Sequence, residues 1–178
     1  MICKNIEECF NKQIEKKSVE SCVNKEAECI EVSDDRSLVK CEERKKKYVL
    51  ENTKRNHVVL YRMDGGVISQ DKTTPQGTCK CDYLFAINGK ECDAILTELK
   101  GVDVLHSLKQ IDGTLNQFRG FFLKFSHVYG RVVVSSSVPN IRTNPSYVNL
   151  VKKLHNYGGN LKIFEMKKSE KDIDLSKK

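Results

Sequence analysis

Short apolar runs, separated by turn residues, follow one another along the middle and the C-terminal half of the chain. Six of them have the length and composition of β-strands, at residues 48–52, 57–62, 81–87, 93–100, 131–135 and 161–164. Asn88-Gly89 separates the third run from the fourth, which predicts that these two strands form a hairpin. The second run ends at a turn signal, Asp64-Gly65-Gly66.

Two stretches have the residue spacing of amphipathic helices. The first follows Gly101, with Asp103 as its expected N-cap, and its apolar residues recur at steps of three and four: Val104, Leu108, Ile111, Leu115, Phe118 and Phe122. The second contains Tyr147 to Leu154 and ends at Gly158-Gly159. Together with the strands, this order predicts an α/β fold in which helices flank and sandwich a mixed central β-sheet.

The same pattern divides the chain into three parts. Residues 1–47 are expected to form a helical N-terminal extension packed on the core, because Ile6, Phe10 and Ile14 have loose helical spacing and Ser33-Asp34-Asp35 is typical of a helix start. Residues 48–166 form the core, since a chain of 178 residues can bury one. The lysine-rich segment 167–178 is expected to be a mobile basic tail.

Composition excludes only a few classes of function and location. No apolar run approaches the ~20 residues that a membrane span needs, and the N-terminus lacks the apolar segment of a signal peptide, so we expect a cytoplasmic protein with no membrane contact. The eight cysteines are then expected to be reduced thiols rather than a zinc site. The net charge of +7 is compatible with a polyanionic partner but does not require one.

The strongest candidates for catalytic and metal-binding residues lie on the predicted hairpin. Glu98 and Lys100 are two residues apart on a strand and therefore project from the same face, while Asp82 begins the preceding strand. Two carboxylates and an amine at one place form a hard-oxygen site suited to Mg²⁺. Asp82 joins Glu98 only if the connection around Asn88-Gly89 has an odd number of residues, because a slip of one residue turns a side chain to the other face.

These residues and the elements after them resemble the PD-(D/E)XK nuclease superfamily, in particular its small stand-alone members with a restriction-endonuclease-like core. The similarity covers residues 48–165, although Cys81 rather than proline precedes Asp82. The resemblance implies that Asp82, Glu98 and the backbone carbonyl of Leu99 bind Mg²⁺ or Mn²⁺. It also implies that Lys100 positions or activates the attacking water and stabilises negative charge.

Other residues are candidates for supporting roles. By resemblance, Gln110 on the following helix would line the active site, although a solvated amide is an equal alternative. Asp64 could stabilise the turn through hydrogen bonds of its side chain, or it could be an accessory acid near the metal. Glu42 or Glu43 could supply a further acid. The candidates for contacts with nucleic acid are Lys45, Lys46, Lys54, Arg55 and Gln117.

The sequence therefore predicts a divalent-metal-dependent hydrolase of phosphodiester bonds, with DNA favoured over RNA and an endonuclease over an exonuclease. A core of this size is expected to form a homodimer or to belong to a larger assembly. Two alternatives stay open. One is a non-catalytic module that keeps the nuclease fold and binds nucleic acid or protein, and the other is a regulatory protein whose N-terminus docks a partner.

Overall fold

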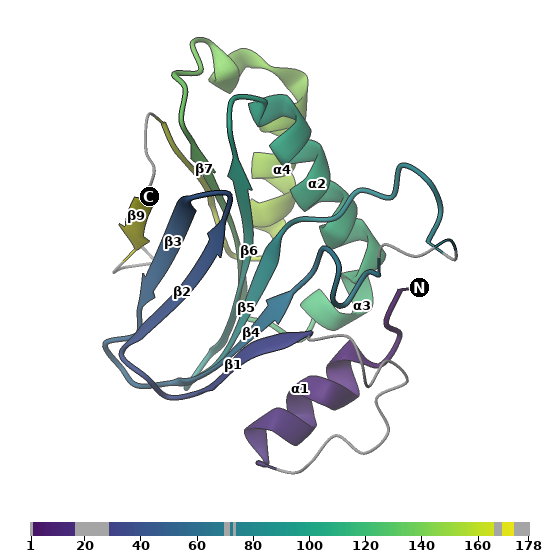
Figure 1. The fold of residues 1–178 in the computed structure, drawn as a ribbon, viewed down its shortest axis with the longest axis vertical. Helices are drawn as coiled ribbons and strands as arrows, with labels where there is room; N and C mark the ends of the chain where they lie inside the picture. The colour runs from purple at the N-terminus through teal and green to yellow at the C-terminus, as the bar shows by residue number, and fades with distance from the viewer. Residues whose placement is uncertain (1, 17–28, 70–71, 73, 166–168, 173–178) are drawn as a thin grey trace.

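The computed structural model describes residues 2–16, 29–69, 72, 74–165 and 169–172. A mixed six-stranded sheet lies at the centre of an α/β fold (Figure 1). Its strands, in spatial order, are β1 (Ile30–Asp34), β4 (His57–Arg62), β5 (Tyr83–Asn88), β6 (Cys92–Lys100), β7 (His127–Val134) and β8 (Leu161–Phe164). From β1 to β6 the neighbours are antiparallel, whereas β6, β7 and β8 are parallel.

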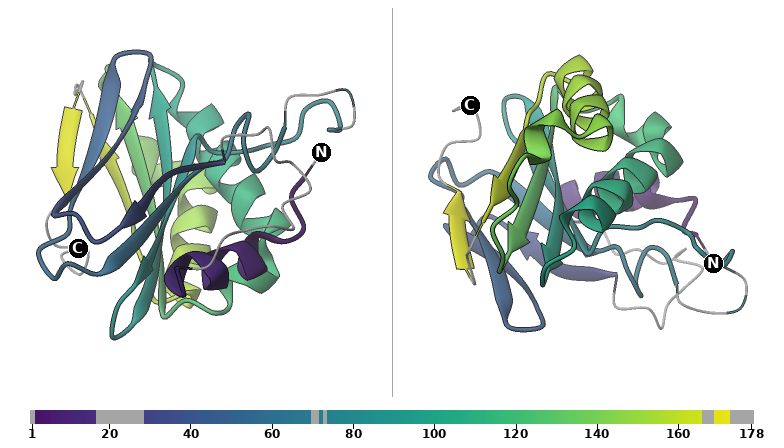
Figure 2. Two further views of the ribbon diagram at one scale, coloured as in Figure 1. Left: turned by 60° about the horizontal axis from the view of Figure 1, so that its bottom comes forward. Right: turned by 90° about the horizontal axis from the view of Figure 1, so that it is seen from above.

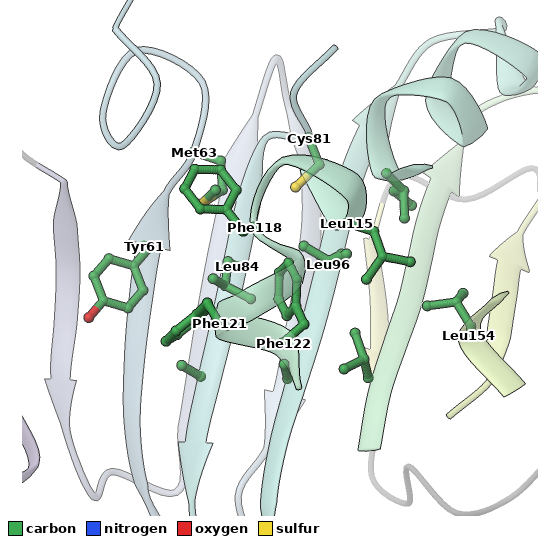
Figure 3. Close-up of a cluster of buried hydrophobic side chains, with 14 of the residues drawn as sticks. Tyr61, Met63, Cys81, Leu84, Leu96, Leu115, Phe118, Phe121, Phe122 and Leu154 are labelled. Atoms are coloured by element: carbon green, nitrogen blue, oxygen red, sulfur yellow. The ribbon is translucent and has the colours of Figure 1, made fainter. Parts of the chain in front are cut away.

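Helices cover one face of this sheet (Figure 2). They are α1 (Ile6–Ile14), α2 (Val104–Gln117), α3 (Arg119–Phe122) and α4 (Pro145–Asn156), with a short 3₁₀ helix η1 (Ile141–Thr143) before α4. Each α-helix contributes to one buried cluster, in which Leu115, Phe122 and Leu154 accompany Leu84 and Leu96 of the sheet (Figure 3). The apolar stripe on α2 is therefore the main cover of the sheet, as its sequence predicts.

A second sheet covers the opposite face of the central sheet. It contains β2 (Leu38–Glu43), β3 (Lys46–Glu51) and β9 (Ser169–Asp172), in the order β2-β3-β9. Cys41 and Tyr48 from this sheet pack with Leu60, Phe85 and Ile95 of the central sheet. The prediction that helices sandwich the sheet is therefore wrong for the described residues, since their helices share one face and three strands take the other.

The predicted helical extension of residues 1–47 is correct for α1 and wrong for residues 30–47. Residues 30–34 are β1, residues 38–43 are β2 and β3 begins at Lys46, while residues 17–28 lie outside the described part. In β2 the buried Val39 and Cys41 alternate with exposed neighbours, which is the period of a strand with one buried face. The many charged residues of this short segment obscure its alternation, so the sequence favours a helix there.

The C-terminal segment also departs from its prediction. Residues 169–172 do not belong to a mobile tail, because they form β9, which pairs in parallel with β3. Residues 173–178 lie outside the described part of the chain. The long helix expected after Gly101 is interrupted at Phe118, where α2 ends and α3 begins.

A buried ion pair links β9 to the central sheet. Arg131 of β7 is fully buried, and its Nε donates to a carboxylate oxygen of Asp172. The Tyr48 hydroxyl donates to the same carboxylate over 3.2 Å, and Nη1 of Arg131 donates to the side-chain oxygen of Asn160 over 2.9 Å. Removing one partner of such a pair leaves a buried charge without compensation.

We therefore expect Asp172→Ala to lower the free energy of unfolding by about 3–5 kcal/mol. Lys171→Ala is the matched control, because Lys171 pairs with Glu51 in a largely exposed position, and it should change stability by less than about 1 kcal/mol. Denaturant unfolding measures both values. A loss below about 1 kcal/mol for Asp172→Ala would show that β9 does not dock in solution.

Candidate active site

The connection between β5 and β6 sets the register of the two strands. Asn88 pairs with Cys92, which leaves three residues, 89–91, between the paired positions. Tyr83 pairs with Thr97 at the other end of the hairpin, so the next position places Asp82 across from Glu98. The predicted odd-numbered connection is confirmed, and with it the register that a site shared by Asp82 and Glu98 requires.

Glu98 contacts both Asp82 and Lys100. The backbone N–H of Asp82 donates to Oε2 of Glu98 over 3.0 Å. In return, the backbone N–H of Leu99 donates to Oδ2 of Asp82 over 2.7 Å. The Lys100 ammonium lies 3.0 Å from the other Glu98 oxygen, Oε1. Backbone groups thus fix one oxygen of each carboxylate, so the two acids are held in place by the strands themselves.

Both carboxylates are buried, which makes their charge costly. Glu98 is fully buried, and burial together with the nearby Asp82 carboxylate raises its pKa to about 8. Burial also raises the pKa of Asp82 to about 6, against the opposing effect of the Leu99 N–H and the Lys100 charge. Partial burial lowers the pKa of Lys100, but Glu98 and Asp82 outweigh it, so the net shift is upward and the ammonium form is favoured.

Carboxylate and carbonyl oxygens are the type of donor that suits a small divalent cation. Oε1 of Glu98 is buried and accepts no hydrogen bond of good geometry, although the Lys100 ammonium is close. An ion held by Asp82, Glu98 and the Leu99 carbonyl would relieve the repulsion between the two acids. Mg²⁺ is commonly bound by one or two carboxylates and several waters. No group of three His, Cys, Asp or Glu side chains with metal-binding geometry occurs among the described residues.

One face of α2 holds the segment that leads into Asp82. Oε1 of Gln110 accepts the Lys80 N–H over 2.5 Å, and the Thr114 hydroxyl accepts the Cys81 N–H over 2.8 Å. The Gln117 amide donates to the Cys79 carbonyl over 2.9 Å. Gln110 therefore contacts the segment that leads into Asp82, and its role in an active site stays a prediction. Gln117, predicted to contact nucleic acid, bonds to the protein backbone. Sequence reasoning missed Thr114, which follows Gln110 by one helical turn.

Asp64 lies near the site and pairs with another residue. Its Oδ1 is 2.9 Å from the Lys80 ammonium, and the backbone of its neighbour Met63 donates to the Asp82 carbonyl over 2.8 Å. The Asp64 charge adds to the raised pKa of Asp82, for which burial is the largest cause. A metal-binding role for Asp64 stays a prediction.

The β2–β3 hairpin brings the upstream acids to the same region. The Tyr83 hydroxyl donates to the Glu42 carbonyl over 2.9 Å, which holds β2 over the start of β5. Glu43 contributes, after burial, to the raised pKa of Asp82. The carboxylate of Glu42 pairs with Lys47 at 3.2 Å. Of the two upstream acids, Glu43 is thus the one whose charge acts on the site.

The predicted basic contacts separate into two groups. Lys45 lies in the turn between β2 and β3, and Lys46 is the first residue of β3. Both follow Glu43 and lie at the end of the sheet that carries Asp82. Lys54 and Arg55 precede His57, which pairs with Asn88 at the far end of β5. One bound phosphate cannot reach both groups at once.

Comparisons with known proteins add no identification, since no protein-family model, curated protein or solved structure matches the chain. The resemblance to PD-(D/E)XK nucleases therefore stays a prediction from the motif. None of the helices in the described residues is long and apolar enough to cross a membrane.

The contact between α2 and the segment before Asp82 can be tested at Gly113. A Cβ there would lie 2.3 Å from the Cys79 Cβ, so Gly113→Ala should lower the free energy of unfolding by about 1–3 kcal/mol. At Gly120, in α3, a Cβ meets nothing within 4 Å, and Gly120→Ala should instead stabilise by up to about 1 kcal/mol. Equal effects in denaturant unfolding would contradict this packing.

The raised pKa of Glu98 predicts a pH-dependent stability in EDTA. The folded protein holds a proton on Glu98 that the unfolded chain releases above about pH 4.5, so this contribution is complete at lower pH and disappears as pH rises through about 8. Glu98→Gln removes the effect, and its stability relative to wild type should rise by about 1–3 kcal/mol between pH 5 and pH 8.

Glu42→Gln provides the control, because the Glu42 side chain is about half exposed. Its stability relative to wild type should stay constant over the same pH range. Urea unfolding at both pH values measures all three proteins. A Glu98→Gln difference that does not change with pH would contradict the burial of an ionisable Glu98.

Proposed function

We propose that the protein is a divalent-metal-dependent nuclease that hydrolyses phosphodiester bonds, with DNA as the favoured substrate. The observation that supports this most is the contact of two buried carboxylates and an ammonium at one strand end. Keeping two desolvated acids together opposes folding, and a structural ion pair would need only one of them. If the site binds a cation, the second carboxylate has a role as a metal ligand.

The residues would divide the work by charge. Asp82, Glu98 and the Leu99 carbonyl would hold Mg²⁺ or Mn²⁺, which supplies Lewis acidity and a bound water of lowered pKa. Lys100 keeps its proton. Partial burial lowers its pKa, but the negative charges of Glu98 and Asp82 raise it by more. A charged Lys100 cannot accept a proton from water, so its role would be to neutralise the developing charge on the phosphoryl oxygens. Gln110 would position Asp82 through the Lys80 backbone.

The small size of the core also motivates the proposal that the protein acts as a homodimer or within a larger assembly. We extend the preference for an endonuclease over an exonuclease, made from the sequence, to the proposed function. The Lys100 side chain retains 29% exposure, so its ammonium is accessible to a phosphate from solvent.

A cleavage assay tests the proposal. Purified protein is incubated with supercoiled DNA, linear DNA and RNA in Mg²⁺, Mn²⁺ or EDTA. Metal-dependent cleavage by wild type should fall by a factor of about 10²–10³ in Lys100→Met, and Glu98→Ala should abolish it. Lys100→Arg should recover part of the activity, since it restores the positive charge. Lys90→Ala, exposed in the β5–β6 connection, should cleave like wild type.

Each alternative outcome has a distinct meaning. Equal cleavage by wild type, Lys100→Met and Glu98→Ala would identify a contaminating nuclease. Binding without cleavage in every metal would favour the non-catalytic module. An inactive Lys100→Arg that folds and binds metal would contradict the purely electrostatic role of Lys100.

A further inference from the structure

The turn between β2 and β3 has an unusual composition for its geometry. Glu43 pairs with Lys46, so the connection consists of Arg44 and Lys45 alone. Both residues have positive φ angles, 45° and 66°. A two-residue turn with two positive φ angles favours Asn-Gly, because other residues are strained there. Strained positions of this kind cluster at functional sites.

The side chains of this turn present positive charge to solvent. Arg44 has 86% of its side chain exposed, and its one ion pair with a described residue is that with Glu43, at 3.8 Å. Lys47, the next cation along β3, is paired with Glu42. Lys45 is exposed, and neither it nor Lys46 makes an ion pair in the part of the chain that the structure describes. The turn therefore carries more positive charge than its own acids compensate.

The position of the turn ties it to the candidate active site. The Tyr83 hydroxyl holds the Glu42 carbonyl at 2.9 Å, and Tyr83 directly follows Asp82. Two residues beyond Glu42, the turn begins. The positive charge of Arg44 is also close enough to interact with that of Lys100. In Figure 1 the turn lies at the end of the molecule where β6 finishes.

We propose that the Arg44-Lys45 turn binds the phosphate backbone of the substrate beside the site formed by Asp82, Glu98 and Lys100. This inference rests on the proposed nuclease function and assigns the surface that would hold the rest of the polynucleotide. A small phosphodiester has no second phosphate, so the turn should contribute to the cleavage of DNA and not to the cleavage of a small phosphodiester. The strained backbone holds two long cationic side chains outward, where shorter turn residues could not reach a phosphate.

Lys54 and Arg55 provide an internal comparison. They carry the same two charges on the next turn along the chain, between β3 and β4, and Arg55 also has a positive φ angle, 52°. This turn lies at the opposite end of β5, and Nη1 of Arg55 is 3.5 Å from the Asp35 carbonyl. The two turns thus carry the same charges, but only the first has two consecutive positive φ angles, and the two differ in their distance from Asp82.

The test replaces Arg44-Lys45 by Asn-Gly, which suits the turn, so that a loss of binding cannot follow from unfolding. The double variant R44N/K45G should melt at or above the wild-type temperature. Its affinity for duplex DNA in EDTA, measured by fluorescence anisotropy, should fall at least tenfold at low salt. The slope of log affinity against log salt should decrease by about 1–2, since each cation on a phosphate contributes about one.

The second measurement compares substrates. For R44N/K45G, the ratio of kcat/KM on DNA to kcat/KM on bis(p-nitrophenyl) phosphate should fall at least tenfold relative to wild type. The control variant K90A/K124A loses the same amount of charge from two exposed lysines outside the predicted nucleic-acid contacts. It should change the ratio by less than twofold and the salt slope by less than 0.5.

The outcomes separate the inference from the function on which it rests. If wild type cleaves neither substrate, the proposed function fails, while the binding data still decide the role of the turn. If R44N/K45G binds DNA with wild-type affinity and salt slope, the clamp is overturned whatever the activity. Equal losses in both double variants would assign the effect to net charge and would also overturn the clamp.

Discussion

The register of the β5–β6 hairpin is the constraint on which the candidate site depends. A connection with an even number of residues would turn Asp82 away from Glu98, and the mutual backbone contacts of the two acids could not form. The three-residue connection is far from the chemistry, and yet it decides which face each acid occupies. The site is therefore a consequence of strand pairing, and side-chain choice matters only once that pairing is set.

The two layers that cover the central sheet have different relations to this site. α2 binds the segment before Asp82 through Gln110 and Thr114, so the helix-side core and the position of one acid are coupled. The β2-β3-β9 sheet lies on the other face, held by the buried pair of Arg131 and Asp172. Its hairpin brings Glu43 and the following basic turn toward the same strand end, so both covers contribute to the surroundings of the acids.

Several local features oppose stability at this end of the molecule. Glu98 is fully buried beside a second carboxylate, and the β2–β3 turn holds two long side chains at positive φ angles. Burial of an acid beside a second acid and a strained backbone each destabilise a fold. Their occurrence around one strand end is what a binding or catalytic site would require.

The sequence by itself determined the elements with strong periodicity, such as β4, β8, the apolar stripe of α2 and the hairpin around Asn88-Gly89, because local spacing specifies them. It also determined the pairing of Asp82 with Glu98 once an odd connection was assumed. Only the tertiary structure decided that β2 is a strand, that β9 docks on β3, and that Lys45 and Lys54 lie at opposite ends. Those features depend on which distant segment covers an exposed sheet face, and a short charged segment does not carry that information locally.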